Sequence, residues 1–246
     1  MGTTVKNNLA DVTGIDERAV ASAPQVRSVY VYEAPVRIWH WINASAILVL
    51  CITGYLIGSP LPSVGGEASD HFQMGYIRFA HFAAGYVFAI GLIGRVYWAF
   101  VGNHHAREMV TLPVLRLVYW REVWAMFSWY LFLRPRPNQY VGHNPMARLM
   151  MFVGYFLVAI FMLVTGFALY GEGLQAGSWA DKMFGWVIPL LGQSQGVHTW
   201  HHLGMWAMVL FVIVHIYAAI REDIMGRQSI VSTMISGSRT FKDGAP

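Results

Sequence analysis

The sequence predicts an all-α membrane protein built as a bundle of four transmembrane helices. Of the 246 residues, 56% are hydrophobic and only 12% are charged, so the composition lies outside the usual range of soluble domains. The mean hydropathy of +0.43 points the same way. Four apolar stretches also have roughly the 20 residues that a helix needs to cross a hydrocarbon core of about 30 Å.

The four predicted spans follow one another with polar segments between them. They run from about 38 to 58, 77 to 101, 147 to 170 and 198 to 220. Residues 1–34 lack the basic, apolar and small-residue order of a secretory signal, so we expect a mobile cytoplasmic tail. Residues 35–225 then form the membrane domain, and residues 226–246 form a second cytoplasmic tail.

The distribution of charge predicts the orientation of the bundle. Most Lys and Arg residues lie in the two tails and the central loop. The loop between the first two spans carries Glu67 and Asp70, and the loop between the last two carries Glu172 and Asp181. Because cytoplasmic loops are enriched in basic residues, both termini and the central loop are expected in the cytoplasm.

The central loop, residues 102–145, contains a candidate amphipathic helix. Leu115 to Leu133 mixes charged residues with Trp and Tyr, a pattern typical of a helix at the membrane surface. The alternative, a fifth span, would have to accommodate the adjacent Arg121 and Glu122, and it would invert the charge rule downstream. We therefore expect a cytoplasmic loop helix.

Four of the ten histidines fall inside the spans at two depths. His201 and His215 are fourteen residues apart in the last span, which returns the helix to within roughly 40° of the same face after a rise of about 21 Å. His40 lies about one turn inside the cytoplasmic edge of the first span, and His81 lies near the outer edge of the second. Depth therefore pairs His40 with His215 on the inner side, and His81 with His201 on the outer side.

This arrangement is typical of a cytochrome with two haems. Imidazole is a strong axial ligand of haem iron, and ionisable residues inside a span are usually functional. A single histidine in a span could instead bond a neighbouring helix, but four histidines at two matched depths favour ligation. The one cysteine, Cys51, cannot form an internal disulfide, bind an iron–sulfur cluster or attach a c-type haem. We therefore expect two non-covalent b haems, with their irons about 20 Å apart along the membrane normal.

Two motifs resemble the b-type cytochrome subunit of membrane-bound nickel–iron hydrogenases. The first comprises Arg37–Trp41 and Cys51–Gly54, and the second comprises Trp200–Leu203 with Trp206, Phe211 and His215. The resemblance extends over roughly residues 30–225. It departs at His198–Thr199, where the family pattern has an arginine and a small residue, and this weakens any role for a basic side chain there.

The resemblance implies a respiratory-chain role in the inner membrane of a bacterium. The wider superfamily includes the cytochrome subunit of formate dehydrogenase, whose fourth span supplies a ligand to each of two haems. Electrons would arrive from a hydrogenase small subunit, bound with its large subunit on the outer side, and leave to quinone. The chain would not cleave hydrogen itself. A cytochrome of another respiratory complex, and a non-redox membrane anchor or transporter, remain as alternatives.

Three further residues are candidates for binding parts of the cofactor or the quinone. Arg95 lies fourteen residues after His81, where it could pair with a propionate of the inner haem or serve as an ordinary cytoplasmic-side arginine. The stretch Tyr140–Pro145 resembles the superfamily segment at the quinone site, which makes His143 and Asn144 candidate quinone ligands. Alternatively, Asn144 only caps the helix that begins at Pro145.

A faint repeat relates the two halves of the chain. Thr53-Gly54 in the first span is echoed by Thr165-Gly166 in the third, and Val96-Tyr97 is echoed by Ile216-Tyr217.

Bis-histidine iron has no open coordination position, which argues against oxygen activation at these haems. The pI of about 9.3 follows from the cytoplasmic loops, so we expect lipid rather than nucleic acid as the surrounding partner.

Overall fold

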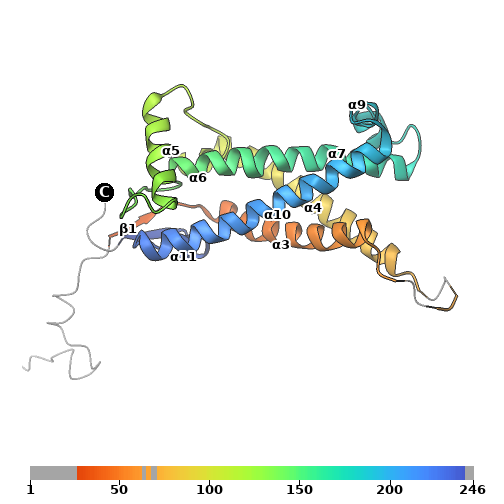
Figure 1. The fold of residues 1–246 in the computed structure, drawn as a ribbon, viewed down its shortest axis with the longest axis horizontal. Helices are drawn as coiled ribbons and strands as arrows, with labels where there is room; N and C mark the ends of the chain where they lie inside the picture. The colour runs from red at the N-terminus through yellow and green to blue at the C-terminus, as the bar shows by residue number, and fades with distance from the viewer. Residues whose placement is uncertain (1–26, 63–64, 68–70, 242–246) are drawn as a thin grey trace, which may run out of the picture.

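The computed structural model describes residues 27–62, 65–67 and 71–241, which form an elongated helical bundle (Figure 1). Four helices are long and apolar enough to cross a membrane: α3 (Ala34–Gly58), α4 (Gln73–Val101), the continuous helix Pro145–Leu174 and α10 (Gln193–Met225). The predicted four-helix bundle is therefore confirmed. At 33 residues, α10 is about 50 Å long and extends beyond a hydrocarbon core of about 30 Å.

The bundle is made of two helical pairs that meet at a shared core. Helix α3 packs along α4, and α10 packs along α7 (Val158–Leu174), the last part of the third span. The core between the pairs includes Ile47, Phe88, Tyr155 and Phe211. Only 22% to 28% of each apolar stretch is buried, so most of its side chains face outward, as lipid-facing helices require.

The third span changes its helical geometry part of the way along. It begins as α6 (Pro145–Met150), widens into the π-helix η3 (Met151–Leu157) and continues as α7. Segments of π-helix occur often at functional sites. Here the segment carries Tyr155, which is buried and donates a hydrogen bond to Asn43 Oδ1 on α3 over 3.1 Å.

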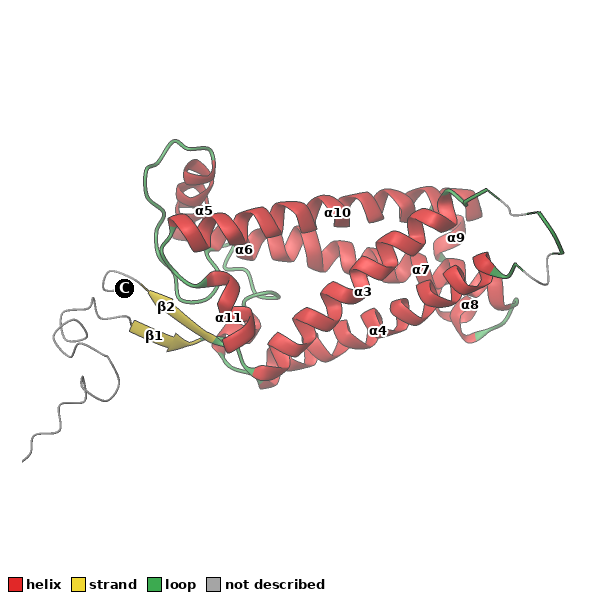
Figure 2. Cartoon of the chain, turned by 90° about the horizontal axis from the view of Figure 1, so that it is seen from below, coloured by secondary structure: helices red, strands yellow, loops and turns green. Residues whose placement is uncertain are grey.

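A small sheet closes one end of the bundle, which we call the sheet end (Figure 2). Strand β1 (Arg27–Tyr30) pairs antiparallel with β2 (Ser238–Phe241), and α11 (Ile230–Ser236) connects α10 to β2. Both strands lie within the segments predicted as cytoplasmic tails. Their pairing joins residues far apart in the sequence, so no local sequence pattern predicts it. The remaining tail residues, 1–26 and 242–246, lie outside the described residues.

The central loop carries two short helices at the sheet end. These are η2 (His104–Arg107) and α5 (Leu117–Tyr130), which lies across the axis of the bundle (Figure 1). With 14 residues, α5 is about 21 Å long and is too short to be a fifth span. Its exposed Leu117 and Trp124 are consistent with a helix at the membrane surface. At the opposite end lie α8 (Trp179–Phe184) and α9 (Val187–Leu190).

Candidate functional site

Four histidines form two facing pairs at opposite ends of the bundle. His40 on α3 faces His215 on α10 with 6.3 Å between ring centroids. His81 on α4 faces His201 on α10 with 6.5 Å between ring centroids. The structure thus brings together the same residues that depth matching pairs. We call His40 and His215 the sheet-end pair, and His81 and His201 the far pair.

The separation within each pair suits one metal ion between two imidazoles. Two imidazole–metal bonds of about 2 Å, together with the ring radii, span roughly 6 Å. In the described part of the chain, no three His, Cys, Asp or Glu residues lie close enough to hold a bare metal ion. A haem iron needs only two protein ligands, since the porphyrin supplies the other four nitrogens. Each pair therefore fits a bis-histidine haem.

Each histidine of the far pair is contacted by a threonine and lies close to the glycine that follows that threonine in the sequence. A Cβ atom on Gly54 would lie 3.2 Å from His81 Cε1, and a Cβ on Gly166 would lie 3.2 Å from His201 Cε1. Both rings therefore occupy space that any larger residue would restrict. The preceding threonines contact the same rings, with 2.8 Å from Thr53 Oγ1 to His81 Nδ1 and 2.7 Å from Thr165 Oγ1 to His201 Nδ1.

Several buried polar atoms on α3 and α4 have no hydrogen-bond partner in the described part of the chain. Among the described residues, Arg95 Nε and Nη1, Trp39 Nε1 and His40 Nδ1 are buried and make no hydrogen bond. Arg95 is 4% exposed, and its guanidinium lies 5.5 Å from the centre of the Trp39 ring. A buried cation without an anion is strongly unfavourable. Glu108 acts on Arg95 electrostatically, but no described carboxylate forms an ion pair with it, so the guanidinium could still bind a haem propionate.

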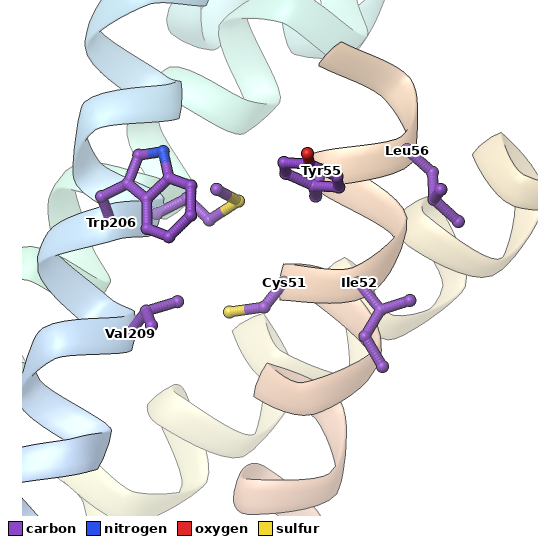
Figure 3. A pocket seen from close by; sticks show the side chains of 7 residues that line it. Cys51, Ile52, Tyr55, Leu56, Trp206 and Val209 are labelled. Carbon is purple, nitrogen blue, oxygen red and sulfur yellow. The ribbon is translucent and has the colours of Figure 1, made fainter. Parts of the chain in front are cut away.

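An apolar groove opens beside the far pair, between α3 and α10. It has a volume of about 290 Å³ and is lined by Cys51, Ile52, Tyr55, Leu56, Met205, Trp206 and Val209. Figure 3 shows Cys51 and Tyr55 on α3 facing Trp206 and Val209 on α10 across this gap. Met205 Sδ would lie 3.7 Å from a Cβ on Gly54, which links the groove to the far pair. The groove offers space for the apolar edge of a porphyrin.

A cluster of hydrogen-bonded polar residues lies at the sheet end. Glu108 accepts hydrogen bonds from His143 N over 2.8 Å and contacts His105 Nδ1 at 2.7 Å. Tyr32 OH lies 3.0 Å from His143 Nδ1. Burial raises the pKa of Glu108, but hydrogen bonds from His105 and His143 outweigh it and hold the pKa well below its ordinary value. Glu108 is therefore a carboxylate at neutral pH.

The same cluster includes His105 and Asn144. The ring of His105 on η2 contacts the Glu108 carboxylate, with 2.7 Å from Nδ1 to Oε1. Asn144 caps α6 by accepting a 2.7 Å hydrogen bond from Ala147 N, and it donates a 2.9 Å bond to Glu222. Asn144 is 2% exposed, and its side chain is engaged in these two hydrogen bonds. Asn144 therefore acts as the N-cap of α6, and its candidate role toward quinone stays a prediction.

Other members of this cluster carry no signal in the sequence. Arg239 on β2 donates hydrogen bonds to the carbonyls of Tyr140 and Gly142, and so holds the loop that presents His143. Glu108, Tyr32 and Arg239 come from three separate regions of the chain. Only the three-dimensional structure brings them together.

Comparison with known proteins identifies the relatives of this chain. Residues 31–237 match the family model described as prokaryotic cytochrome b561. The chain is similar to the probable Ni/Fe-hydrogenase B-type cytochrome subunit of Cupriavidus necator, with 66% identity over 96% of this chain and 97% of the relative. The corresponding subunit of Azotobacter vinelandii is 64% identical over 89% and 91% of the two chains. The probable Ni/Fe-hydrogenase 1 B-type cytochrome subunit of Escherichia coli is 52% identical over 89% and 94%.

Proposed function

Because the chain belongs to the prokaryotic cytochrome b561 family, we propose that it passes electrons from hydrogen oxidation through two b haems to the quinone pool. It is a multi-pass membrane cytochrome b with an electron-transfer role beside a hydrogenase. The observation that carries the two-haem proposal is the pair of facing histidines at each end of α10. The relatives reported above are all named for hydrogenase, which favours this partner over formate dehydrogenase or another reductase.

We assign one haem to each histidine pair. His81 and His201 would ligate the haem at the far end, and His40 and His215 the haem at the sheet end. A bound haem supplies an iron that accepts and releases one electron at a time. Arg95 would neutralise a propionate at the sheet end, and the apolar faces of α3 and α10 would exclude water from both irons.

The proposed orientation places the sheet end in the cytoplasm. The positive-inside rule supports it, because the tails and central loop are rich in basic residues while the far-end loops carry Glu67, Glu172 and Asp181. The far end, with α8 and α9, would then meet the hydrogenase small subunit, itself bound to the large subunit. The membrane is the bacterial inner membrane in this proposal, since that is where respiratory hydrogenases deliver electrons to quinone.

His143 is our candidate for the quinone site. Reducing a quinone to a quinol requires two protons as well as two electrons, so a proton-carrying group must lie near the inner haem. The His143 side chain is 26% exposed and contacts the buried carboxylate of Glu108 at 3.0 Å. This pairing would orient the imidazole to bond a quinone carbonyl or deliver a proton. Asn144 would contribute indirectly, by fixing the start of α6 and the position of Glu222.

Haem quantitation on the purified complex tests the proposal. We expect a reduced-minus-oxidised spectrum of b-type haem and two haems per chain. His81→Ala and His40→Ala should each lower the haem content to one, while His71→Ala, which changes an exposed loop histidine, should leave two. Hydrogenase subunits should copurify with the chain, and membranes should reduce quinone with hydrogen. Absence of b haem, or retention of both haems in the ligand variants, would refute the assignment.

A further inference from the structure

Two buried threonines contact the ring nitrogens of the far histidine pair. The hydroxyl of Thr53 donates to Val49 O over 2.6 Å, and that of Thr165 donates to Phe161 O over 2.8 Å. A threonine hydroxyl has one hydrogen, which each of these bonds uses. With the hydroxyl hydrogens used in this way, we infer that the Oγ1 atoms accept from the two rings and that Nδ1 of each ring carries the proton. The backbone of Leu50 also bonds the His81 ring, as a second partner beside Thr53. The free lone pair is left on Nε2, the atom available to iron.

The arrangement occurs twice, in corresponding places of the two helical pairs. Thr53 on α3 contacts His81 on α4, and Thr165 on α7 contacts His201 on α10. In each case the next residue is the glycine that makes room for the same ring. Both threonines are buried, with 8% and 1% exposure, so water does not compete for the hydroxyl. The repeated Thr-Gly pairs in the sequence therefore serve the two ligands of one haem.

The sheet-end pair has no comparable support. His40 Nδ1 is buried without a hydrogen bond to any described residue. The ring of His215 stacks on Phe211, with centroids 5.6 Å apart and planes 19° apart. The buried guanidinium of Arg95 lies against Trp39, the neighbour of His40. The two ends of the molecule thus give their histidines opposite electrostatic surroundings.

The difference between the ends has a direct effect on redox potential. A hydrogen bond donated by the remote ring nitrogen raises the basicity of a metal-bound imidazole. A more basic ligand stabilises oxidised iron and lowers the reduction potential, whereas a nearby buried cation favours the reduced state. Both influences place the potential at the far end below that at the sheet end.

We propose that Thr53 and Thr165 are positioning residues that fix His81 and His201 as Nε2 ligands and keep the far haem at a lower potential than the sheet-end haem. With haem held by both pairs, one electron would pass from the site of His81 and His201 to the site of His40 and His215, with no bond made or broken. The electron comes from hydrogen oxidation and ends on quinone, so the inference rests on the proposed function. The two threonines would thereby favour transfer toward the quinone side.

A redox titration of the whole complex tests this inference. We expect two b-haem components with different midpoint potentials in the unaltered protein. Thr53→Val and Thr165→Val keep the branched shape but remove the hydroxyl. Each should shift the lower-potential component upward, and the double variant should shift it further, while the higher-potential component stays in place. The electron paramagnetic resonance signal of the shifted haem should change with it.

Two further sets of variants distinguish the effect of the threonine hydroxyl from the effect of the rest of the side chain. Thr53→Ser and Thr165→Ser keep the hydroxyl and should retain the original potentials. Thr199→Val removes a hydroxyl that bonds Gln195 O in the same manner, 3.0 Å away, and should change neither potential. If the Val variants lose the far haem, retention of that haem in the Ser variants supports the inference, and loss in both overturns it.

The failures of the two proposals are distinguishable. Unaltered potentials in Val variants that keep both haems would overturn the role of the threonines and leave the two-haem function intact. A shift of the higher-potential component alone would overturn it too. A complex with no b haem before any substitution would instead refute the proposed function.

Discussion

At the scale of single residues, chemically identical imidazoles lie in two different surroundings. His81 and His201 each contact a buried threonine hydroxyl, while His40 Nδ1 is buried and bonds no described residue. Both pairs are spaced for an iron atom, so the distinction between them comes from neighbouring side chains. Such neighbours tune a metal as strongly as the ligands themselves.

Replacing Arg95 with glutamine tests the propionate assignment. The substitution keeps the size of the side chain but removes the positive charge that favours a reduced haem. We expect the midpoint potential of the sheet-end haem to fall by on the order of 60 mV, equivalent to a tenfold change in a one-electron equilibrium. A spectroscopic redox titration measures it. Arg78→Gln, an exposed site on the same helix, is the matched control.

An unchanged potential for the sheet-end haem in Arg95→Gln would contradict the propionate role. Arg95→Lys should preserve most of the potential, because the charge remains even though the geometry of the guanidinium is lost. If Arg95→Lys lowers the midpoint potential as much as Arg95→Gln does, the shape of the Arg95 side chain matters more than its charge. The electrostatic explanation then fails.

Glu108 predicts a pH dependence of stability. Its folded-state pKa lies below the ordinary value, despite the opposing effect of burial, because His105 and His143 bond the carboxylate. The stability that it contributes is therefore fully present above the unfolded pKa of about 4.3 and is lost as the pH falls through the folded pKa. We expect Glu108→Gln to lower the free energy of unfolding by about 2 kcal/mol at neutral pH.

Thermal unfolding in detergent, followed by tryptophan fluorescence from pH 7 down to pH 3, measures the contribution of Glu108. The gap between the unaltered protein and Glu108→Gln should narrow as the pH falls below about 4. Glu67→Gln, at an exposed loop position, should show no such pH-dependent gap. A gap that stays constant down to pH 3 would mean that the carboxylate charge does not stabilise the fold.

At the scale of helices, α10 is the element that both histidine pairs share. One face presents His201 in the first third of the helix and His215 in the last third, while α3 and α4 each supply one partner. The spacing within a single helix is visible in the sequence because helical periodicity is fixed by the backbone. The π-helix within the third span is not visible, since it depends on how Tyr155 packs among its neighbours.

Close packing of helices at Gly54 and Gly166 predicts a selective loss at the far site. In Gly54→Ala or Gly166→Ala, the new methyl would lie 3.2 Å from a histidine ring and would push it by a few tenths of an ångström. We expect the far haem to be lost or its spectrum to change, with the sheet-end haem retained. Haem quantitation and low-temperature spectra measure this.

Gly94→Ala on α4 is the matched control, because a Cβ there meets no atom within 4 Å. It should keep both haems, and the added methyl should slightly favour the helix. Equal haem loss in Gly94→Ala would show that general helix packing, rather than contact with the histidine, explains the effect.

At the scale of the whole molecule, local and distant features differ in how well the sequence predicts them. Apolar length and histidine depth are local, so the four spans and the facing pairs can be predicted from the chain alone. The pairing of β1 with β2, and the meeting of Tyr32, Glu108 and His143, depend on segments far apart in the sequence. No periodicity encodes such contacts. The sheet-end polar cluster is therefore visible only in the three-dimensional structure.

The position of that cluster leads to a prediction about the complete electron path. If His143 serves the quinone step, His143→Ala should slow hydrogen-dependent quinone reduction by roughly 100-fold, the usual effect of removing a proton-transfer group. The rate at which hydrogen reduces the haems should stay unchanged, because His143 lies beyond both histidine pairs on the path. Stopped-flow spectroscopy would then show haems that remain reduced while quinone is still present.

The rates of haem reduction and of quinone reduction must be measured together. Only the two rates together distinguish a defect in quinone reduction from a defect in electron transfer to the haems. His71→Ala, at an exposed position on the far side, should affect neither rate. Glu108→Gln should resemble His143→Ala in a milder form, because the carboxylate orients the imidazole without itself meeting the quinone. Fast quinone reduction in His143→Ala would mean that the quinone site lies elsewhere. Slow reduction of the haems would mean that the substitution disturbs the helical bundle. In the proposed path, His143 acts after the sheet-end haem, so its loss should slow only the transfer of electrons from that haem to quinone.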